Sequence, residues 1–246
     1  MENLRKKTVG SIVAADYRTA SVFEKNGIDF CCKGNTELSK ACTSRSIDSE
    51  QLVKELNAIG EKQTESIEFN SLSLDSLANY IEVKHHRYVR NTMPQLQTFL
   101  EKLCHVHGQR HPELKQIKEL FDDGVNKLTS HMKKEELILF PYVRKLYESR
   151  RNATNPEPSQ FGSVQNPINA MEIEHETEGN RFNEIRSITG NYTIPEDACT
   201  TYKVTYWMLK EFEEDLHIHI HLENNILFPK AIELEKFILN ELDYKA

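Results

Sequence analysis

Long stretches of the chain repeat apolar residues every three or four positions, which is the spacing of one face of an α-helix. Four such stretches follow one another in the second part of the chain, at about Leu74–Leu103, Leu114–Glu148, Pro167–Ile188 and Thr200–Leu242. The alternating pattern of a β-strand is nearly absent. The pattern therefore predicts an all-α fold whose main part is an antiparallel, up-down four-helix bundle.

The first 60 residues show shorter helical patterns. Ala15–Asn26 and Asp48–Ile59 are the two predicted helices, and Ser46 and Asp48 are candidate caps for the second. A turn-rich segment lies between them, and the polar segment Gly60–Asn70 has the composition of a linker. The chain is therefore expected to divide into a small helical domain at 1–65 and the bundle at 66–246, with a loop at 152–167.

Composition excludes several classes of function. The 246 residues include 38 acidic and 31 basic side chains, which gives a formal charge of −7, and a chain of this charge lacks the concentrated basic surface that nucleic acid binding needs. Mean hydropathy is −0.60, and no run approaches the roughly 20 apolar residues of a membrane-spanning helix. The charged N-terminus is followed by no long apolar stretch, so we expect no secretory signal and a cytoplasmic protein.

The second and fourth helical stretches contain one motif twice. The first copy begins at His131 and Glu135 and ends at Pro141, and the second begins at His219 and Glu223 and ends at Pro229. Each copy reads H-x3-E-x2-I-L-F-P. Residues four apart stack on one face of a helix, so each His–Glu pair can reach a shared metal site.

Helical phase directs the second copy inward, because His219 and Glu223 share a face with apolar residues. His217 and His221 lie roughly opposite, beside Glu213, Glu214 and Asn224, and are expected to be solvated. A single inward histidine is often only a core residue with a satisfied hydrogen bond. Two buried carboxylates are costly unless they are paired or bind a metal, and this favours the metal site.

The spacing of four histidines extends the prediction. His86, His131, His175 and His219 are separated by 45, 44 and 44 residues, so an up-down bundle can bring them to one depth. Four imidazoles with Glu135 and Glu223 suit two metal ions bridged by the carboxylates. Mixed nitrogen and oxygen ligands with open positions favour iron over a closed zinc site, with manganese as a substitute.

A ferritin-like carboxylate site is the alternative use of the same region. Glu82 with His85, and Glu172 with His175, both read E-x-x-H, which is the signature of that site. It would leave the matched His131 and His219 without a role, so the histidine-rich site is preferred. Helical phase alone does not choose between His85 and His86.

Cys31 and Cys32 follow Asp29 and Phe30, and together with the motifs H-x3-E-E-x-I-L-F-P and L-E-N-N-I-L-F-P this pattern resembles the repair-of-iron-centres family of di-iron proteins (RIC, of ScdA and YtfE type). The resemblance covers essentially the whole chain. It implies a small N-terminal domain that holds the paired cysteines, followed by a hemerythrin-like bundle.

The resemblance implies which residues hold the metal. One of two irons would take His86 and His131 and the other His175 and His219, with Glu135 and Glu223 as bridges, and the segment from Val83 to Pro94 matches the family at His86 rather than at His85. The implied function is repair of iron–sulfur clusters damaged by nitric oxide or peroxide. The implied partners are damaged iron–sulfur proteins and small ligands such as NO, O2 or peroxide, and a homodimer is consistent with the resemblance.

The adjacent cysteines form only a strained disulfide ring, so a structural disulfide is not expected. Lys33, where many members of the family have glycine, is expected to favour the thiolate and thereby reactivity at Cys31 and Cys32. Exchange of NO, binding of iron or reversible oxidation are the candidate roles, and two buried small apolar residues are the alternative. No special role is expected for the remaining cysteines or for one further histidine that matches a family segment (Cys42, Cys104, Cys199 and His107).

Three functions remain compatible with these residues. The leading hypothesis is a non-haem di-iron repair protein, and the sequence leaves open whether it donates iron, reduces NO or does both. The second is a hemerythrin-like sensor or carrier of O2 or NO without repair activity. The third is a metal-free helical scaffold.

Overall fold

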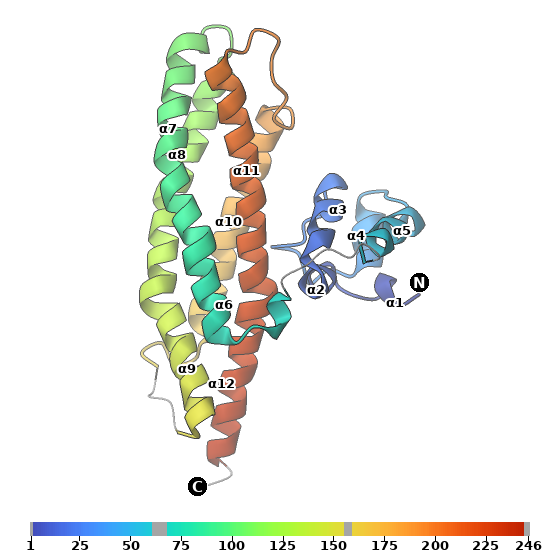
Figure 1. Ribbon diagram of the computed structural model, residues 1–246, viewed down its shortest axis with the longest axis vertical. Coiled ribbons are helices and arrows are strands. Elements are labelled where there is room, and N and C mark those ends of the chain that lie inside the picture. Colours follow the sequence, from blue (N-terminus) through green and yellow to red (C-terminus); the bar gives the residue numbers. More distant parts are fainter. Residues whose placement is uncertain (1, 61–67, 155–158, 244–246) are drawn as a thin grey trace. The chain divides into compact units, whose positions relative to one another are not determined.

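The computed structural model describes residues 2–60, 68–154 and 159–243, and its regular structure there is helical (Figure 1). Thr8 and Glu37 form an isolated β-bridge, and these ranges contain no strand. The all-α prediction is confirmed. Most of the predicted linker and part of the predicted loop, at 61–67 and 155–158, lie outside the described residues. None of the described helices has the length and apolar character needed to cross a membrane.

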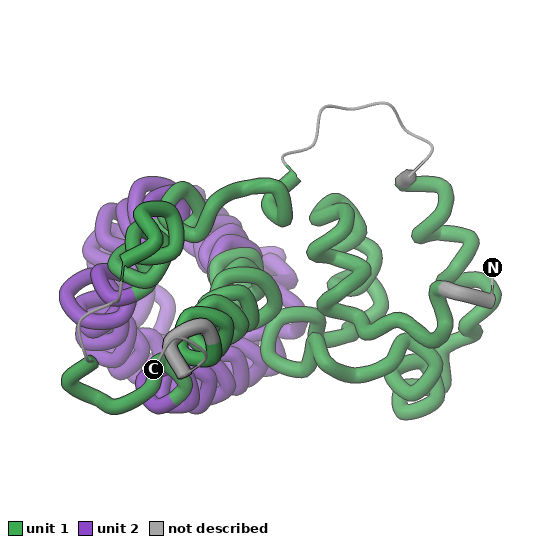
Figure 2. Tube along the Cα trace, turned by 90° about the horizontal axis from the view of Figure 1, so that it is seen from below, with its two compact units in different colours: residues 1–78, 143–165, 217–246 green, residues 79–142, 166–216 purple. Residues whose placement is uncertain are grey.

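The chain divides into two compact units (Figure 2). Unit 1 comprises residues 1–78, 143–165 and 217–246, and unit 2 comprises residues 79–142 and 166–216. The long helices of the bundle contribute to both units. The predicted domain boundary near residue 65 remains a prediction.

The four predicted long stretches are all helical. Their α-helical parts are α6 Leu74–Tyr80, α7 Arg87–His107, α8 Glu113–Lys134, α9 Phe140–Asn152, α10 Gln165–Ile188, α11 Thr200–Leu222 and α12 Phe228–Asp243. Three short π-helical segments interrupt them, at Ile81–His86, Glu135–Leu139 and Glu223–Leu227. The predicted boundaries are thus correct to within about four residues.

The second and third π-helical segments have a cause in the repeated motif. Each segment is followed by Phe–Pro, at Pro141 and Pro229. Proline has no N–H for the carbonyl four residues earlier, and its ring crowds that carbonyl. A wider π-helical turn relieves the crowding, and such turns are frequent at functional sites. The sequence feature that ends each motif therefore shapes the turn that carries Glu135 or Glu223.

Three phenylalanines fill the core of unit 2. Phe182 stacks on Phe212 with ring centroids 5.4 Å apart, and Phe121 meets Phe212 edge-on at 5.6 Å. All three side chains are buried. Each buries a large apolar surface in geometries that aromatic pairs prefer, so this cluster fixes the spacing of α8, α10 and α11.

The N-terminal region consists of α1 Glu2–Arg5, α2 Val9–Ala15, α3 Ala20–Lys25, α4 Leu38–Ser44 and α5 Ser49–Gly60, together with 3₁₀ turns at Tyr17–Thr19 and Phe69–Ser71. The predicted helix at Ala15–Asn26 is wrong at its start. Asp16 is extended and accepts a hydrogen bond from the Arg18 N–H, so it ends α2 and starts a new turn. Helix α4 was not predicted.

Helix α5 matches its prediction, and its cap is Asp48. The Asp48 carboxylate accepts hydrogen bonds from the N–H groups of Glu50 at 2.8 Å and Gln51 at 3.4 Å. Ser46, the other candidate, instead has a positive φ of 55° and belongs to the turn before the helix.

Candidate metal centre

Three buried histidines and one buried glutamate meet in unit 2. His86 ends the first π-helical segment, and His175 lies in α10. His131 lies in the last turn of α8, and Glu135 begins the π-helical segment that follows it. Glu135 Oε2 is 3.3 Å from the Nε2 atoms of both His86 and His131. His175 Nε2 is 3.1 Å from His131 Nε2. Each of these residues is at most 3% exposed, so unpaired charge would be costly here.

Carboxylates orient the rings of His86 and His131 through the Nδ1 atoms, which lie opposite Nε2. His86 Nδ1 is 2.7 Å from Glu136 Oε1, and His131 Nδ1 is 2.9 Å from Glu174 Oε2. A carboxylate on the outer nitrogen fixes the tautomer of a histidine and leaves the other nitrogen free to bind a metal. This arrangement is typical of histidines that hold an ion.

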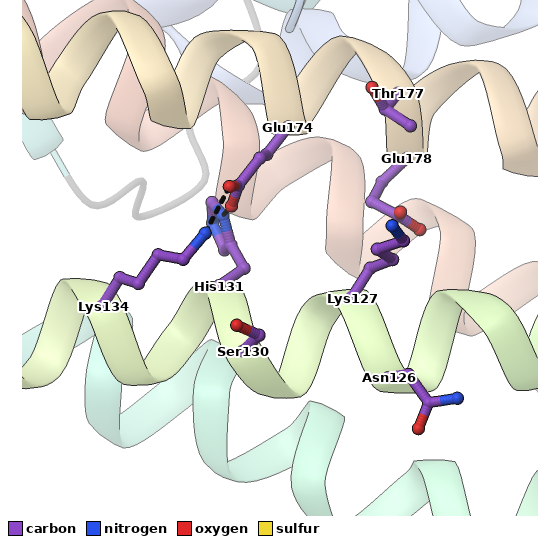
Figure 3. A pocket seen from close by; sticks show the side chains of 8 residues that line it. All are labelled: Asn126, Lys127, Ser130, His131, Lys134, Glu174, Thr177 and Glu178. Atoms are coloured by element: carbon purple, nitrogen blue, oxygen red, sulfur yellow. Dashed lines mark hydrogen bonds and ion pairs between the residues drawn. The ribbon is translucent and has the colours of Figure 1, made fainter.

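Glu174 has a second partner, Lys134, as Figure 3 shows. The hydrogen bond with His131 and the ammonium of Lys134 lower the pKa of the Glu174 carboxyl to about 2. Glu174 is therefore ionised throughout the neutral range and presents a full negative charge to the back of His131.

A cavity of about 440 Å³ opens beside His131 between α8 and α10. Figure 3 shows Lys134 and Glu174 on one side of it and Lys127 and Glu178 on the other. Burial raises the pKa of Glu178, although Arg181 forms an ion pair with it at 2.9 Å. The cavity therefore reaches the His131 ring, which is one of the predicted metal ligands.

The structure separates the neighbouring His85 and His86. His85 Nδ1 is 3.0 Å from Asp215 Oδ1, whereas His86 faces Glu135. Glu172, which the ferritin-like alternative needs as a ligand, is exposed. These positions favour the histidine-rich site over the ferritin-like site.

Unit 1 contains the second His–Glu pair. His219 in α11 and Glu223 at the start of the third π-helical segment are buried, and His219 Nε2 is 3.1 Å from Glu223 Oε1. The four-residue spacing thus brings the two ligand atoms together, as the motif predicts.

Within unit 2, His131, Glu135 and His175 are close enough together to hold a metal ion. This group pairs His131 with His175, whereas the resemblance implies that His131 shares an ion with His86. Buried imidazoles with shared carboxylates suit iron, so the residues present fit a cation centre of that type.

His217 and His221 are buried, so the prediction that they are solvated is wrong. Phe30 of the N-terminal region meets both rings edge-on, at 6.1 and 5.7 Å between centroids. Burial lowers the pKa of His221 to about 4, so its ring is neutral near pH 7. Helical phase showed correctly that this face points away from His219, but it did not reveal that the N-terminal region covers the face. Glu213, predicted on the same face, is also buried.

The loop with Cys31 and Cys32 is built around Asp29. Asp29 Oδ1 accepts hydrogen bonds from the backbone N–H groups of Cys31, Cys32 and Lys33 at 3.1, 2.9 and 3.3 Å. The two sulfur atoms are 3.7 Å apart, so the two cysteines form no disulfide with each other. Asp29, Cys31 and Cys32 form a further group that could hold a metal ion.

Cys31 does not have the lowered pKa that Lys33 predicts. The hydrogen bond with Cys32, burial and the negative charge of Asp29 raise the pKa of the Cys31 thiol well above its usual range. Cys31 is 4% exposed. The thiol is therefore protonated at neutral pH, and the environment of the loop outweighs the neighbouring lysine.

Sequence comparison gives two family matches that together cover most of the chain. Residues 5–60 match ScdA_N, a domain of unknown function (DUF542), and residues 78–231 match the hemerythrin HHE cation binding domain. The iron–sulfur cluster repair protein YtfE of Yersinia pestis (strain Pestoides F) is 32% identical over 231 residues, which are 94% of this chain and 99% of that protein. YtfE of Yersinia pseudotuberculosis serotype O:1b (strain IP 31758) matches to the same extent. The chain belongs to this family of hemerythrin-domain proteins.

The hemerythrin-domain match contains all six residues predicted as ligands, and the ScdA_N match contains Cys31 and Cys32. The family relationship confirms the resemblance and the fold class. It also establishes a cation-binding domain. The individual ligands, the identity of the ion and the role of the cysteines remain predictions.

Several residues that organise these sites were not predicted from the sequence. Glu136 and Glu174 were not singled out, because acidic residues on surface-type helices are common and their histidine partners lie 50 and 43 residues away. Asn225 was also not predicted. Its amide donates to the carbonyl oxygens of Phe30 at 3.3 Å and Cys31 at 3.2 Å. In the first copy of the motif the matching residue is Leu137, and this difference between the copies was the available signal.

Asp29→Asn is expected to raise the reactivity of Cys31. Asparagine keeps an oxygen that accepts the three N–H bonds, but it removes the negative charge that raises the thiol pKa. We expect alkylation of Cys31 by iodoacetamide at pH 7.5 to be about three- to tenfold faster, because a tenfold change in thiolate corresponds to one pKa unit. The measurement uses a Cys32→Ser background and peptide mapping. Asp48→Asn, which alters the cap of α5, is the control, and equal rates in the two variants would contradict the role of Asp29.

Proposed function

We propose that the protein is a cytoplasmic di-iron protein that repairs iron–sulfur clusters damaged by nitrosative or oxidative stress. The proposed ligands are His86, His131, His175 and His219, with Glu135 and Glu223 as shared carboxylates. Manganese is the proposed substitute ion. A homodimer remains a prediction.

The arrangement around Glu135 is the observation that carries this proposal. Two buried imidazoles direct Nε2 toward one carboxylate oxygen, and each has an acidic partner on Nδ1. A salt bridge in the core would not need both nitrogens of two rings to be directed in this way. The 32% identity to proteins named for iron–sulfur cluster repair supports the function, and the cation-binding domain supports the metal.

The chain's own residues have distinct tasks in this function. Glu135 and Glu223 would hold the metal through their carboxylates, and the four histidines would hold it through imidazole nitrogens. Glu136 and Glu174 keep the rings of His86 and His131 in place and strengthen them as donors. When bound, iron would supply redox chemistry and bind NO, O2 or peroxide.

The cysteine loop is the proposed point of exchange with a damaged client. Asn225 lies two residues after Glu223 and holds the Cys31 carbonyl, so the loop is attached next to one of the proposed ligands. Asp29, Cys31 and Cys32 offer a carboxylate and two thiols to an iron ion in transit. Because the Cys31 thiol is protonated at rest, binding of iron there must release a proton.

Recovery of a damaged enzyme tests this function. A dehydratase whose [4Fe–4S] cluster has been damaged by NO is incubated with the iron-loaded protein, and its activity is followed. We expect recovery with the wild type and little recovery with Cys31→Ser/Cys32→Ser at unchanged iron content. No recovery with an iron-loaded wild type would contradict the repair function, and equal recovery with the double variant would remove the thiols from it.

A carrier or sensor of small molecules is the second candidate, and the cavity beside His131 favours it. Such a protein would bind about two irons and a diatomic ligand reversibly. It would leave the damaged dehydratase inactive under the same conditions. The recovery experiment therefore separates the two functions.

Glu174→Gln is expected to weaken metal binding about tenfold, because partners on the outer nitrogen of a metal-binding histidine typically contribute 10- to 100-fold in affinity. The glutamine keeps a hydrogen bond to His131 but loses the charge. Competition with a chelator of known affinity measures the effect. Glu172→Gln is the control, since Glu172 lies on the same helix and is exposed. Equal affinities in the two variants would show that Glu174 does not support the site.

A further inference from the structure

A histidine and a cysteine meet in unit 2, away from the residues assigned to the metal. His107 is the last residue of α7, and Cys199 immediately precedes α11. His107 Nε2 is 3.2 Å from Cys199 Sγ, although the two residues are 92 positions apart in the sequence. Sequence reasoning assigned neither residue a role, because no spacing links them.

His107 is buried and Cys199 is exposed, as expected for a histidine that acts as a base toward a reactive thiol. The His107 ring is 4% exposed and its Nδ1 has no hydrogen-bond partner among the described residues. Tyr202 holds the ring edge-on at 5.4 Å between centroids. Cys199 is exposed. A fixed, buried imidazole therefore faces a thiol that reagents can reach.

A cavity of about 300 Å³ gives access to this pair. Lys102, Leu103, Val106, Thr200 and Thr201 complete its lining. The Cys199 carbonyl accepts the Lys203 N–H at 3.1 Å, so Cys199 is the residue on which α11 begins. The first N–H groups of a helix lack partners within the helix and favour negative charge.

The charged groups near the pair do not cancel the preference of the helix start for negative charge. Asp197 is engaged by His111 at 2.9 Å and by Arg110 at 2.8 Å, and Glu113 binds the other nitrogen of His111. Both nearby carboxylates are therefore neutralised by their own partners. Lys102 lines the cavity, and His111 and Tyr202 contact the His107 ring. Arg110, Glu113 and Asp197 contact His111 or one another.

We propose that Cys199 and His107 form a nucleophilic thiol site that reacts with small hydroperoxides. His107 Nε2 takes the thiol proton while sulfur attacks the outer peroxide oxygen. The S–O bond forms and the O–O bond breaks, and the leaving oxygen regains the proton from Nε2. The thiol and hydroperoxide thus become a sulfenic acid and an alcohol, or water from hydrogen peroxide. Sulfur is oxidised by two electrons and the peroxide is reduced by two.

The helix end and the cavity fit this substrate class. The oxygen that leaves becomes negative as the O–O bond breaks, and the free N–H groups at the start of α11 stabilise negative charge there. The cavity admits a small molecule, and the Thr200 and Thr201 residues give it a polar rim. The site is independent of the metal function proposed above.

Alkylation tests the activation of the thiol without involving the metal. The rate of Cys199 with iodoacetamide is measured by peptide mapping from pH 6 to 10 on the iron-loaded protein. We expect His107→Asn to slow it at least about tenfold at pH 7, with rates that converge once the thiol ionises unaided. Cys104 in the same digest and the variant His111→Asn are the controls. An unchanged profile in His107→Asn would overturn the proposal and leave the contact as a helix cap.

Trapping of the sulfenic acid tests the reaction itself. The protein is treated with tert-butyl hydroperoxide and a 1,3-dione that labels sulfenic acids. We expect label at Cys199 in the wild type, none in Cys199→Ser, and at least about tenfold less in His107→Asn. Iron content is expected to be the same in all three, which separates this result from the metal function. Absence of label at a Cys199 that alkylates rapidly would overturn the assignment to hydroperoxides.

Discussion

Glu135→Ala is expected to remove both metal ions, and His175→Ala only one. Glu135 Oε2 is 3.3 Å from the Nε2 atoms of both His86 and His131, whereas His175 Nε2 is 3.1 Å from His131 Nε2. Iron per chain, measured after loading and desalting, should fall from about two in the wild type to well below one in Glu135→Ala and to about one in His175→Ala. The graded loss follows from sharing of a carboxylate between two ions, since each ion loses a ligand when the bridge is removed.

The control for this result is Lys133→Ala, an exposed residue on the same turn as Glu135. It should retain the iron content of the wild type. If Glu135→Ala and His175→Ala lost the same amount of iron, Glu135 would not be shared between two metal ions. If neither lost iron while both stayed folded by circular dichroism, the ligand assignment would be wrong.

Gly34→Ala is expected to destabilise the cysteine loop by about 3 kcal/mol, at the upper end of the usual cost of overpacking. A Cβ at this position would lie 2.6 Å from the backbone oxygen of Phe30 and 2.3 Å from Asn225 Oδ1. The amide of Asn225 can rotate, but then its bonds to Phe30 and Cys31 are lost, and the backbone oxygen has no such freedom. Hydrogen exchange in peptides covering 28–36 measures the local opening.

Two neighbours calibrate this effect. Asn35→Ala changes an exposed side chain of the same loop and should leave exchange unchanged. Gly10→Ala should have an intermediate effect, because its nearest contact is the end of the Asn225 side chain at 2.2 Å and its nearest backbone contact is the Gly34 oxygen at 3.0 Å. Alkylation of Cys31 should increase in the same order. If hydrogen exchange in Gly34→Ala were the same as in the wild type, the loop would accommodate a Cβ at this position, and the prediction would be wrong.

The bundle could be predicted from the sequence because its information is local. Apolar spacing locates each long helix, and Pro141 and Pro229 mark the turns that carry the two glutamates. The choice between His85 and His86 was beyond periodicity, since both side chains are buried, on different sides of one helix. Only the partners separate them, Asp215 for one and Glu135 for the other.

The features that were missed depend on contacts between distant segments. His217 and His221 lie on the polar-looking side of α11 and are buried only because Phe30 covers them. Asp16 breaks a helical pattern through a side-chain bond to the next turn, which the spacing of apolar residues does not register. Lys33 next to two thiols suggested a low pKa, but burial and the Asp29 carboxylate act more strongly on Cys31 than a solvated lysine does.

The attachment of the cysteine loop beside Glu223 has a thermodynamic consequence. Asn225 joins the Cys31 carbonyl to the helical turn on which Glu223 lies, so occupancy at one end and order at the other are linked equilibria. If an ion bound at Glu223 increases the equilibrium constant for closing the loop by some factor, closing the loop must increase the affinity for the ion by the same factor. A client that draws the loop away would thereby lower the affinity of the site for the proposed ion by the same ratio.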